Sequence, residues 1–250
     1  VTDRARVVTN NKKNLIKVKN TLDFLTKISL KIRDNFQGKI IGITGSCGKT
    51  SVKELVSSSL NKIGKVTSSP KSFNNKYGVP LSLFNLKLNN NYGVFEIGMD
   101  KKGEIDFLSS LVKPDIGIIT NVSYAHAQNF KNIFQIAKAK SEIINNIKSD
   151  GYIVLNADDG FFSFHKKIAN KRKLKIITFG FSSGSNIKFL KIKKFGNYFK
   201  IKVKIFGESK VFKIRYKYMN YIKNILSTLA VLSILRKTSS LNINFFEDFS

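Results

Sequence analysis

A glycine-rich turn, Thr44-Gly-Ser-Cys-Gly-Lys-Thr50, carries the strongest chemical signal in the sequence. It follows a buried apolar run and precedes an amphipathic helix, so its glycines let backbone N–H groups point at phosphate oxygens. Lys49 would then reach the β- and γ-phosphates, and the Thr50 hydroxyl would hold Mg²⁺. The generic spacing wants a first glycine where this chain has Ile43. We predict a phosphate loop; the alternative is a glycine turn with a chance Gly-Lys-Thr.

Three polar residues lie at or after the carboxyl ends of predicted strands, as the glycine-rich turn does. Glu96 ends one strand, and Asn121 and His126 come after the next. Open α/β sheets bind ligands at the carboxyl ends of their strands, so we expect these side chains near the phosphate loop. Taken alone, Glu96 is equally well a capping or surface carboxylate. A lone histidine such as His126 is more often structural than a ligand.

Lys140 lies in the middle of an apolar helical stripe, whereas Lys138 points to the opposite side of the same helix. The stripe consists of Ile133, Ile136, Ala137, Ile143, Ile144 and Ile147. A lysine that faces a core is costly unless it is paired or chemically altered. The alternative is a side chain that snorkels along the apolar surface to water.

Strands alternating with helices must position these residues, which predicts an α/β fold with a mostly parallel sheet covered by helices on both faces. After Gly184 the apolar period changes to two, and turn signals at Gly196-Asn197 and Gly207-Glu208 predict an antiparallel meander near the C-terminal end. A loop is expected at 67–78. Strands are expected at 39–44, 92–97, 115–122, 151–156 and 174–179, and helices after Thr21, after Lys49, near 104–112, at about 130–147 and at 221–235.

The composition is that of a folded protein, because 42% of the 250 residues are hydrophobic. No apolar run reaches the roughly 18 residues of a membrane span. The single cysteine, Cys47, excludes a disulfide scaffold. The net charge of +28 suggests nucleic acid, but only six of the 44 basic residues are arginine and the lysines are spread along the chain. We interpret the charge as solvated lysines.

Together these residues resemble the central ATP-binding domain of the Mur ligases, which form the amide bonds of peptidoglycan precursors. The chain is most similar to the branch that adds D-alanyl-D-alanine. The resemblance runs from about Ile40 to Leu229, and no single motif carries it. The matching segments, in order, are 44–54, Ser72-Phe-Asn-Asn-Lys-Tyr-Gly-Val-Pro80, Glu96-Ile-Gly-Met-Asp-Lys-Lys-Gly-Glu-Ile105, Ala137-Lys-Ala-Lys-Ser-Glu-Ile143 and Leu155-Asn-Ala-Asp158.

The resemblance implies roles for individual residues. Lys49 matches the lysine that binds phosphate, and Glu96 matches a glutamate that binds magnesium in place of a Walker B aspartate. His126 matches the histidine of a second magnesium site. Lys140 matches a lysine that CO₂ carbamylates, which would give an anion able to bridge to Mg²⁺. The implied catalytic residues are Lys49, Lys140 and His126; the implied metal ligands are Thr50, Glu96, His126 and Lys140; and the implied nucleotide contacts are Thr44, Gly45, Ser46, Cys47, Gly48, Lys49, Thr50, Ser51, Asn75 and Asn224.

Two positions depart from the family pattern. Asn220 stands where a histidine is expected before Asn224, and Gln128 occupies a place often held by an acidic residue. Adenine contacts are therefore less well defined by the sequence than phosphate contacts.

The resemblance also implies a division of the chain. Residues 1–38 would be the tail of a UDP-sugar-binding domain with a linker helix, 39–235 the ATP-binding domain, and 236–250 the start of a connection to a C-terminal domain. The chain would then be a central domain cut at both ends.

The implied function is ATP-dependent ligation of D-alanyl-D-alanine to UDP-MurNAc-tripeptide through an acyl phosphate, with ATP and two Mg²⁺ ions. We expect a cytoplasmic monomer that binds no nucleic acid, has no membrane span and is inactive in ligation when isolated. The alternatives are a related ligase that adds a diamino acid or polyglutamate, and a phosphate-loop NTPase that binds nucleic acid through its positive surface.

Overall fold

The computed structural model describes residues 16–124, 129–215, 221–239 and 241–247. In these residues nine strands form one sheet in the order β2-β3-β1-β4-β5-β6-β7-β8-β9. Strands β1 to β6 run parallel, β7 continues parallel to β6, and β8 and β9 are antiparallel. The strands are β1 (Lys39–Thr44), β2 (Val66–Ser68), β3 (Tyr92–Glu96), β4 (Ile116–Ile119), β5 (Tyr152–Asn156), β6 (Lys175–Gly180), β7 (Ile187–Phe195), β8 (Tyr198–Ile205) and β9 (Glu208–Arg215).

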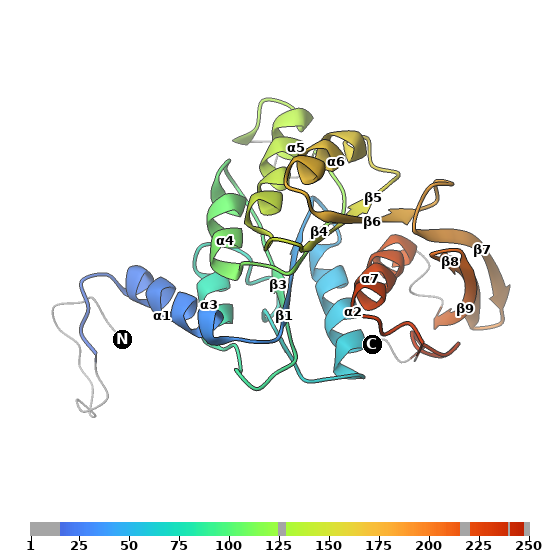
Figure 1. Cartoon of the computed structure of the whole chain (residues 1–250), viewed down its shortest axis with the longest axis horizontal. Coiled ribbons are helices and arrows are strands. Elements are labelled where there is room, and N and C mark those ends of the chain that lie inside the picture. Colours follow the sequence, from blue (N-terminus) through green and yellow to red (C-terminus); the bar gives the residue numbers. More distant parts are fainter. Residues whose placement is uncertain (1–15, 125–128, 216–220, 240, 248–250) are drawn as a thin grey trace.

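Helices cover both faces of this sheet (Figure 1). On one face lie α2 (Lys49–Asn61) and α7 (Ile222–Ile234), and the strands β7–β9 curve around α7. The other face carries α3 (Gly78–Phe84), α4 (Glu104–Val112), α5 (Ile133–Ser141), the 3₁₀ helix η3 (Glu142–Asn146) and α6 (Phe162–Lys171). Helix α1 (Thr21–Asn35) packs against α3 and α4.

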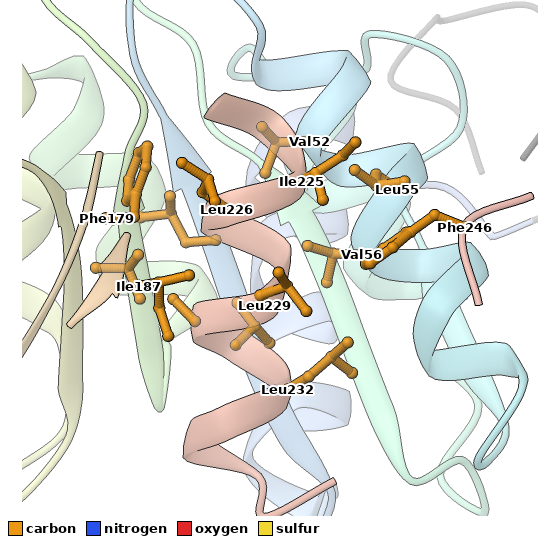
Figure 2. Packing of buried hydrophobic residues seen from close by; sticks show 14 of the residues in the cluster. Val52, Leu55, Val56, Phe179, Ile187, Ile225, Leu226, Leu229, Leu232 and Phe246 are labelled. Atoms are coloured by element: carbon orange, nitrogen blue, oxygen red, sulfur yellow. The ribbon is translucent and has the colours of Figure 1, made fainter. Parts of the chain in front are cut away.

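The core between α2 and α7 fixes the helix that follows the phosphate loop. Apolar side chains of α2 interdigitate with those of α7, and Phe179, Ile187 and Phe246 close the cluster (Figure 2). Because apolar side chains along α2 are packed in this core, burial of apolar surface sets the orientation of its first turn.

The predicted fold class is confirmed, and the structure differs from the prediction in local details. The expected loop at 67–78 contains most of β2 and the start of α3, and α6 was not expected. Strand β2 is an edge strand of the sheet and pairs only with β3. The expected helix at 130–147 is α5 followed by η3, and β4 is shorter than the expected 115–122.

Helix α1 and the last described residues both pack onto this body. Arg33 of α1 is buried and donates hydrogen bonds of 2.6 Å to the carbonyls of Val112 and Lys113. Phe245 and Phe246 belong to the core beside α2. No helix among the described residues is long and apolar enough to cross a membrane.

Candidate active site

The glycine-rich turn lies between β1 and α2, as predicted, and its two glycines are required by geometry. Gly45 has φ +148°, and a Cβ there would lie 1.9 Å from Thr120 Oγ1. Gly48 caps α2 in the left-handed conformation, with φ +81°. A Cβ on Gly48 would lie 3.2 Å from Asn224 Oδ1, which places the predicted nucleotide residue Asn224 beside the loop.

Asn121 fastens the loop to the end of β4. Its carboxamide oxygen accepts from the Cys47 amide at 3.0 Å, its Nδ2 donates to the Cys47 carbonyl at 3.1 Å, and its own carbonyl accepts from the Ser46 amide at 3.0 Å. The predicted proximity of Asn121 is therefore confirmed. Since the Ser46 and Cys47 amides already have partners, the amides at the start of α2 are those left to meet a phosphate.

The side chains of the Gly-Lys-Thr sequence face in two directions. Lys49 folds back over the loop and donates to the carbonyls of Gly45 at 3.0 Å and Ser46 at 3.4 Å. The Thr50 hydroxyl donates to Glu96 Oε2 at 2.8 Å. The predicted meeting of the loop with the end of β3 is thus confirmed for Glu96.

Glu96 is a buried carboxylate held by neutral donors. It is 1% exposed, its Oε1 accepts from Asn74 Nδ2 at 2.6 Å, and no lysine or arginine among the described residues forms an ion pair with it. A buried carboxylate without a cation is costly. The Glu96 carboxylate and the Thr50 hydroxyl provide the oxygen ligands that Mg²⁺ prefers, so the residues present fit that ion. Thr44 Oγ1, at the start of the loop, is also buried with no hydrogen-bond partner in the described structure.

Lys140 points inward from α5, and Lys138 is exposed, as the helical wheel predicted. Lys140 is 1% exposed, and no described residue forms a hydrogen bond or an ion pair with its ammonium. Burial and the nearby charge of Lys49 lower the pKa of Lys140 to about 7. An ammonium this deeply buried is costly unless it is paired or chemically altered.

A cavity of about 450 Å³ opens beside the phosphate loop. Lys49 and the predicted nucleotide residue Asn75 line it, together with Lys76, Tyr77 and Lys101 from the loops before α3 and α4. Asn75 itself holds the turn that leads into α3, because its side-chain oxygen accepts from the Tyr77 and Gly78 amides. His126, Gln128 and Asn220 lie outside the described residues.

Asn74 and Asp158 also shape the site, although no role was predicted for either residue. Asn74 donates a hydrogen bond to Glu96, and the sequence pointed to it only through its place beside Asn75 in the matching segment 72–80. Asp158 accepts hydrogen bonds from Ser182 and from the Phe181 amide and lies 3.5 Å from Lys223, next to Asn224 on α7. Burial alone would raise the pKa of Asp158, but these hydrogen bonds and the Lys223 charge hold it below its usual range.

A glycine-rich turn at a switch point of a parallel sheet, with a lysine, a threonine and a buried glutamate, defines a phosphate-loop nucleotide-binding protein. The profile of the Mur ligase middle domain matches residues 43–232. The chain therefore belongs to the Mur ligase family.

Relatives with assigned names agree with this family. Over 196 residues the chain is 41% identical to the UDP-N-acetylmuramoyl-tripeptide–D-alanyl-D-alanine ligase of Buchnera aphidicola subsp. Acyrthosiphon pisum, covering 77% of this chain and 40% of that protein. The ligase of the same name from Rickettsia prowazekii is 30% identical over 248 residues, covering 98% of this chain and 55% of that protein. The chain thus spans about half the length, or less, of these relatives.

Two solved structures share the fold closely. MurF from Acinetobacter baumannii superposes with a TM-score of 0.86 at 26% identity, covering 94% of this chain and 51% of that one. MurF from Thermotoga maritima in complex with ADP superposes with a TM-score of 0.85 at 26% identity, covering 98% and 56%.

Proposed function

We propose that this chain is the central, ATP-binding part of an enzyme that joins D-alanyl-D-alanine to UDP-MurNAc-tripeptide. The observation that carries the proposal is the hydrogen bond between Thr50 and the buried Glu96 at the mouth of the phosphate loop. The names of the relatives support the choice of substrates. The related diamino-acid and polyglutamate ligases share the fold at 15% identity or less, which says nothing about substrate.

In this reaction the chain positions groups and balances charge, so no side-chain nucleophile is needed. ATP would phosphorylate the terminal carboxylate of the peptide, and the amine of D-alanyl-D-alanine would displace phosphate from the resulting acyl phosphate. Lys49 would leave the Gly45 and Ser46 carbonyls and move to the transferred phosphoryl group, where its charge stabilises the transition state. The amides at the start of α2 would hold the flanking phosphate. Cys47, an exposed free thiol, has no role in this scheme.

Thr50 and Glu96 would hold one magnesium ion, and His126 and Lys140 would contribute to a second. Bound magnesium supplies neutralisation of phosphate charge. Among the described residues no group of three His, Cys, Asp or Glu side chains could hold a metal. The proposed ion would take its remaining ligands from the phosphates of the nucleotide and from water.

Lys140 would act as a carbamate. A neutral amine attacks CO₂ and loses a proton, which forms an N–C bond and leaves an anion with two oxygens. The lowered pKa makes the neutral amine available near pH 7, and the carbamate would remove the repulsion from Lys49. With ¹³C-bicarbonate, the chain should show a carbamate carbon signal by NMR that is lost in Lys140→Met and kept in Lys138→Met. A signal that survives in Lys140→Met would refute this assignment.

The cavity beside the loop would receive the carboxylate end of the peptide. It shares Lys49 with the phosphate site. Its other charged lining residues are Lys76 and Lys101 together with the acidic Asp100 and Glu104, and Phe107 and Leu108 add apolar surface. A carboxylate there would lie next to the phosphoryl group it attacks.

Ligation and nucleotide binding test the proposal separately. The parent protein that contains these residues should form UDP-MurNAc-pentapeptide, detected by mass spectrometry, and Lys49→Met should abolish the product. The isolated 250-residue chain should bind Mg·ATP weakly and form negligible product, because the domains that hold the UDP-sugar and the amino substrate would be elsewhere. Robust ligation by the isolated chain would contradict the proposed division at residues 38 and 235. We further propose a cytoplasmic monomer.

One observation favours the nucleic-acid alternative. On the outer face of the meander, lysines stand directly opposite lysines in adjacent strands, so the structure gathers charges that are dispersed along the sequence. The pairs are Lys188–Lys204, Lys191–Lys202, Lys193–Lys200 and Lys200–Lys213. Like charges in such positions repel.

We still propose no nucleic-acid function. The face carries seven lysines but a single arginine, Arg215, and arginine is the side chain that contacts phosphates in a bidentate manner. Filter binding of a single-stranded oligonucleotide should show no retention at about 150 mM salt. Steep salt-dependent binding would favour the alternative, provided that Lys191→Gln/Lys193→Gln/Lys202→Gln loses it. The charge-matched control on α6, Lys166→Gln/Lys167→Gln/Lys171→Gln, should then retain it.

A further inference from the structure

Lys53, one turn after Thr50 on α2, is a fully buried lysine with an unusual set of partners. Its side chain is 0% exposed. The ammonium donates to the carbonyl of Ser69 at 2.8 Å and to the carbonyl of Lys71, and it pairs with Glu54 at 2.8 Å. Burying an ammonium is costly even when it is paired, and an apolar side chain would fill the same space. Stability alone therefore gives a poor reason for a lysine here.

The segment that accepts the hydrogen bonds of Lys53 is itself hydrogen-bonded to Glu96 and to the strand that carries it. Ser69 is 1% exposed, its amide donates to the Val94 carbonyl at 3.0 Å, and its hydroxyl accepts from the Glu96 amide at 3.1 Å. Two residues later, Lys71 adopts the left-handed conformation, with φ +45°. Because a non-glycine residue rarely adopts this conformation, a contact to its carbonyl helps to fix the turn.

Asn74 forms the remaining hydrogen bonds that hold the Glu96 region in place. Its carbonyl accepts from the Gly98 amide at 2.7 Å, and its side chain donates to the Glu96 carboxylate at 2.6 Å. A Cβ on Gly98 would lie 2.8 Å from the Asn74 carboxamide, so this side chain is tightly seated. The segment from Ser69 to Asn74 thus fixes both the backbone and the carboxylate of Glu96.

The two candidate metal ligands belong to different elements, since Thr50 is on α2 and Glu96 ends β3. We propose that Lys53 is a positioning residue that sets Glu96 relative to Thr50, by anchoring the Ser69–Asn74 segment to the helix that carries Thr50. The proposal rests on the proposed Mg·ATP site. It assigns Lys53 no contact with the nucleotide, and it predicts an effect on magnesium rather than on phosphate binding.

Lys62, an exposed residue directly after the C-terminal end of α2, provides a control for the same chemical change. Its ammonium also donates to a distant backbone carbonyl, that of Phe245, at 2.8 Å. Lys62→Met therefore makes the same chemical change and also frees a distant segment, far from the phosphate loop.

The test measures ATP affinity by isothermal titration calorimetry with and without Mg²⁺, on the 250-residue chain, together with thermal unfolding. In Lys53→Met, the ratio of the two affinities should fall about tenfold or more, as is typical when the groups around a metal ligand are removed. Affinity without Mg²⁺ should stay within about twofold, because Lys49 and the loop are intact. Lys62→Met should keep the wild-type ratio.

A purely structural role for Lys53 gives a different result, namely a lower unfolding temperature with an unchanged Mg²⁺ ratio, and that outcome would overturn the proposal. Should Lys53→Met fail to fold, Ser69→Ala removes the hydroxyl that holds the Glu96 amide, and an unchanged ratio in that variant would overturn it equally. If wild-type binding proves independent of both Mg²⁺ and Lys49, the proposed function itself fails. Wild-type Mg²⁺ dependence combined with an unchanged ratio in the variants refutes only the role of Lys53.

Discussion

Replacing Lys140 by methionine should change how the stability of this chain depends on pH. Methionine keeps most of the side-chain volume and removes the ionisable amine from a position that is 1% exposed. In the folded chain the pKa of Lys140 falls from 10.5 to about 7, because of burial first and the charge of Lys49 second. Between these two values the unfolded chain binds more protons at this position than the folded chain does. Stability therefore rises with pH across that range.

The size of the effect follows from the shift. With the folded pKa at about 7, Lys140 costs about 4 kcal/mol at pH 7 and about 2 kcal/mol at pH 9. The wild-type chain should accordingly gain about 2 kcal/mol from this group between those pH values, and Lys140→Met should not. At pH 7 the variant should be more stable than the wild type, by an amount reduced by any loss of packing.

Urea unfolding in CO₂-free buffer at pH 7 and pH 9 measures this directly. Taking the difference between wild type and variant cancels the titration of groups that do not interact with Lys140. Lys138→Met, an exposed change on the same helix, should keep the wild-type pH dependence. The reasoning is refuted if Lys140→Met shows the same rise as the wild type between pH 7 and pH 9, or if Lys138→Met abolishes it.

Three further changes have defined outcomes. Gly45→Ala should destabilise the chain by about 3 kcal/mol in urea unfolding, because its Cβ would overlap the Thr120 hydroxyl; a loss below about 1 kcal/mol would contradict that geometry. Arg33→Met should cost about 2–4 kcal/mol by leaving the buried carbonyls of Val112 and Lys113 without the guanidinium that they accept from, and a neutral result in the same assay would mean that α1 is not docked as described. In the parent protein Lys140→Ala should abolish turnover, acetate or formate should restore part of it, and Lys138→Ala should do little; an active Lys140→Ala enzyme would rule out the carbamate.

Periodicity predicted the sheet and the position of Lys140 because both depend on local patterns. The buried strands read as apolar runs, and the 3.6-residue wheel placed Lys140 inward and Lys138 outward, as the structure has them. Short elements escaped this approach. Strand β2 has three residues, and α3 has seven with Pro80 in its first turn, so neither spans enough residues to establish a period.

The contacts among the site residues were only partly predictable. That Glu96 approaches Thr50 follows from parallel strands ending at one edge. The contact of Asn74 with Glu96 depends on how the turn at Lys71 closes, and Lys53 binds backbone carbonyls, which no side-chain pattern reveals. The gathering of lysines on the meander likewise depends on strand register.

A crystal structure of this chain with Mg·ADP would test the nucleotide site most directly. The account predicts phosphates at the amides that begin α2, with Lys49 drawn away from the Gly45 carbonyl, and a metal ion bound by Thr50 and Glu96. A nucleotide seated in the cavity between Tyr77 and Phe107, or a metal ion with no contact to Glu96, would contradict it.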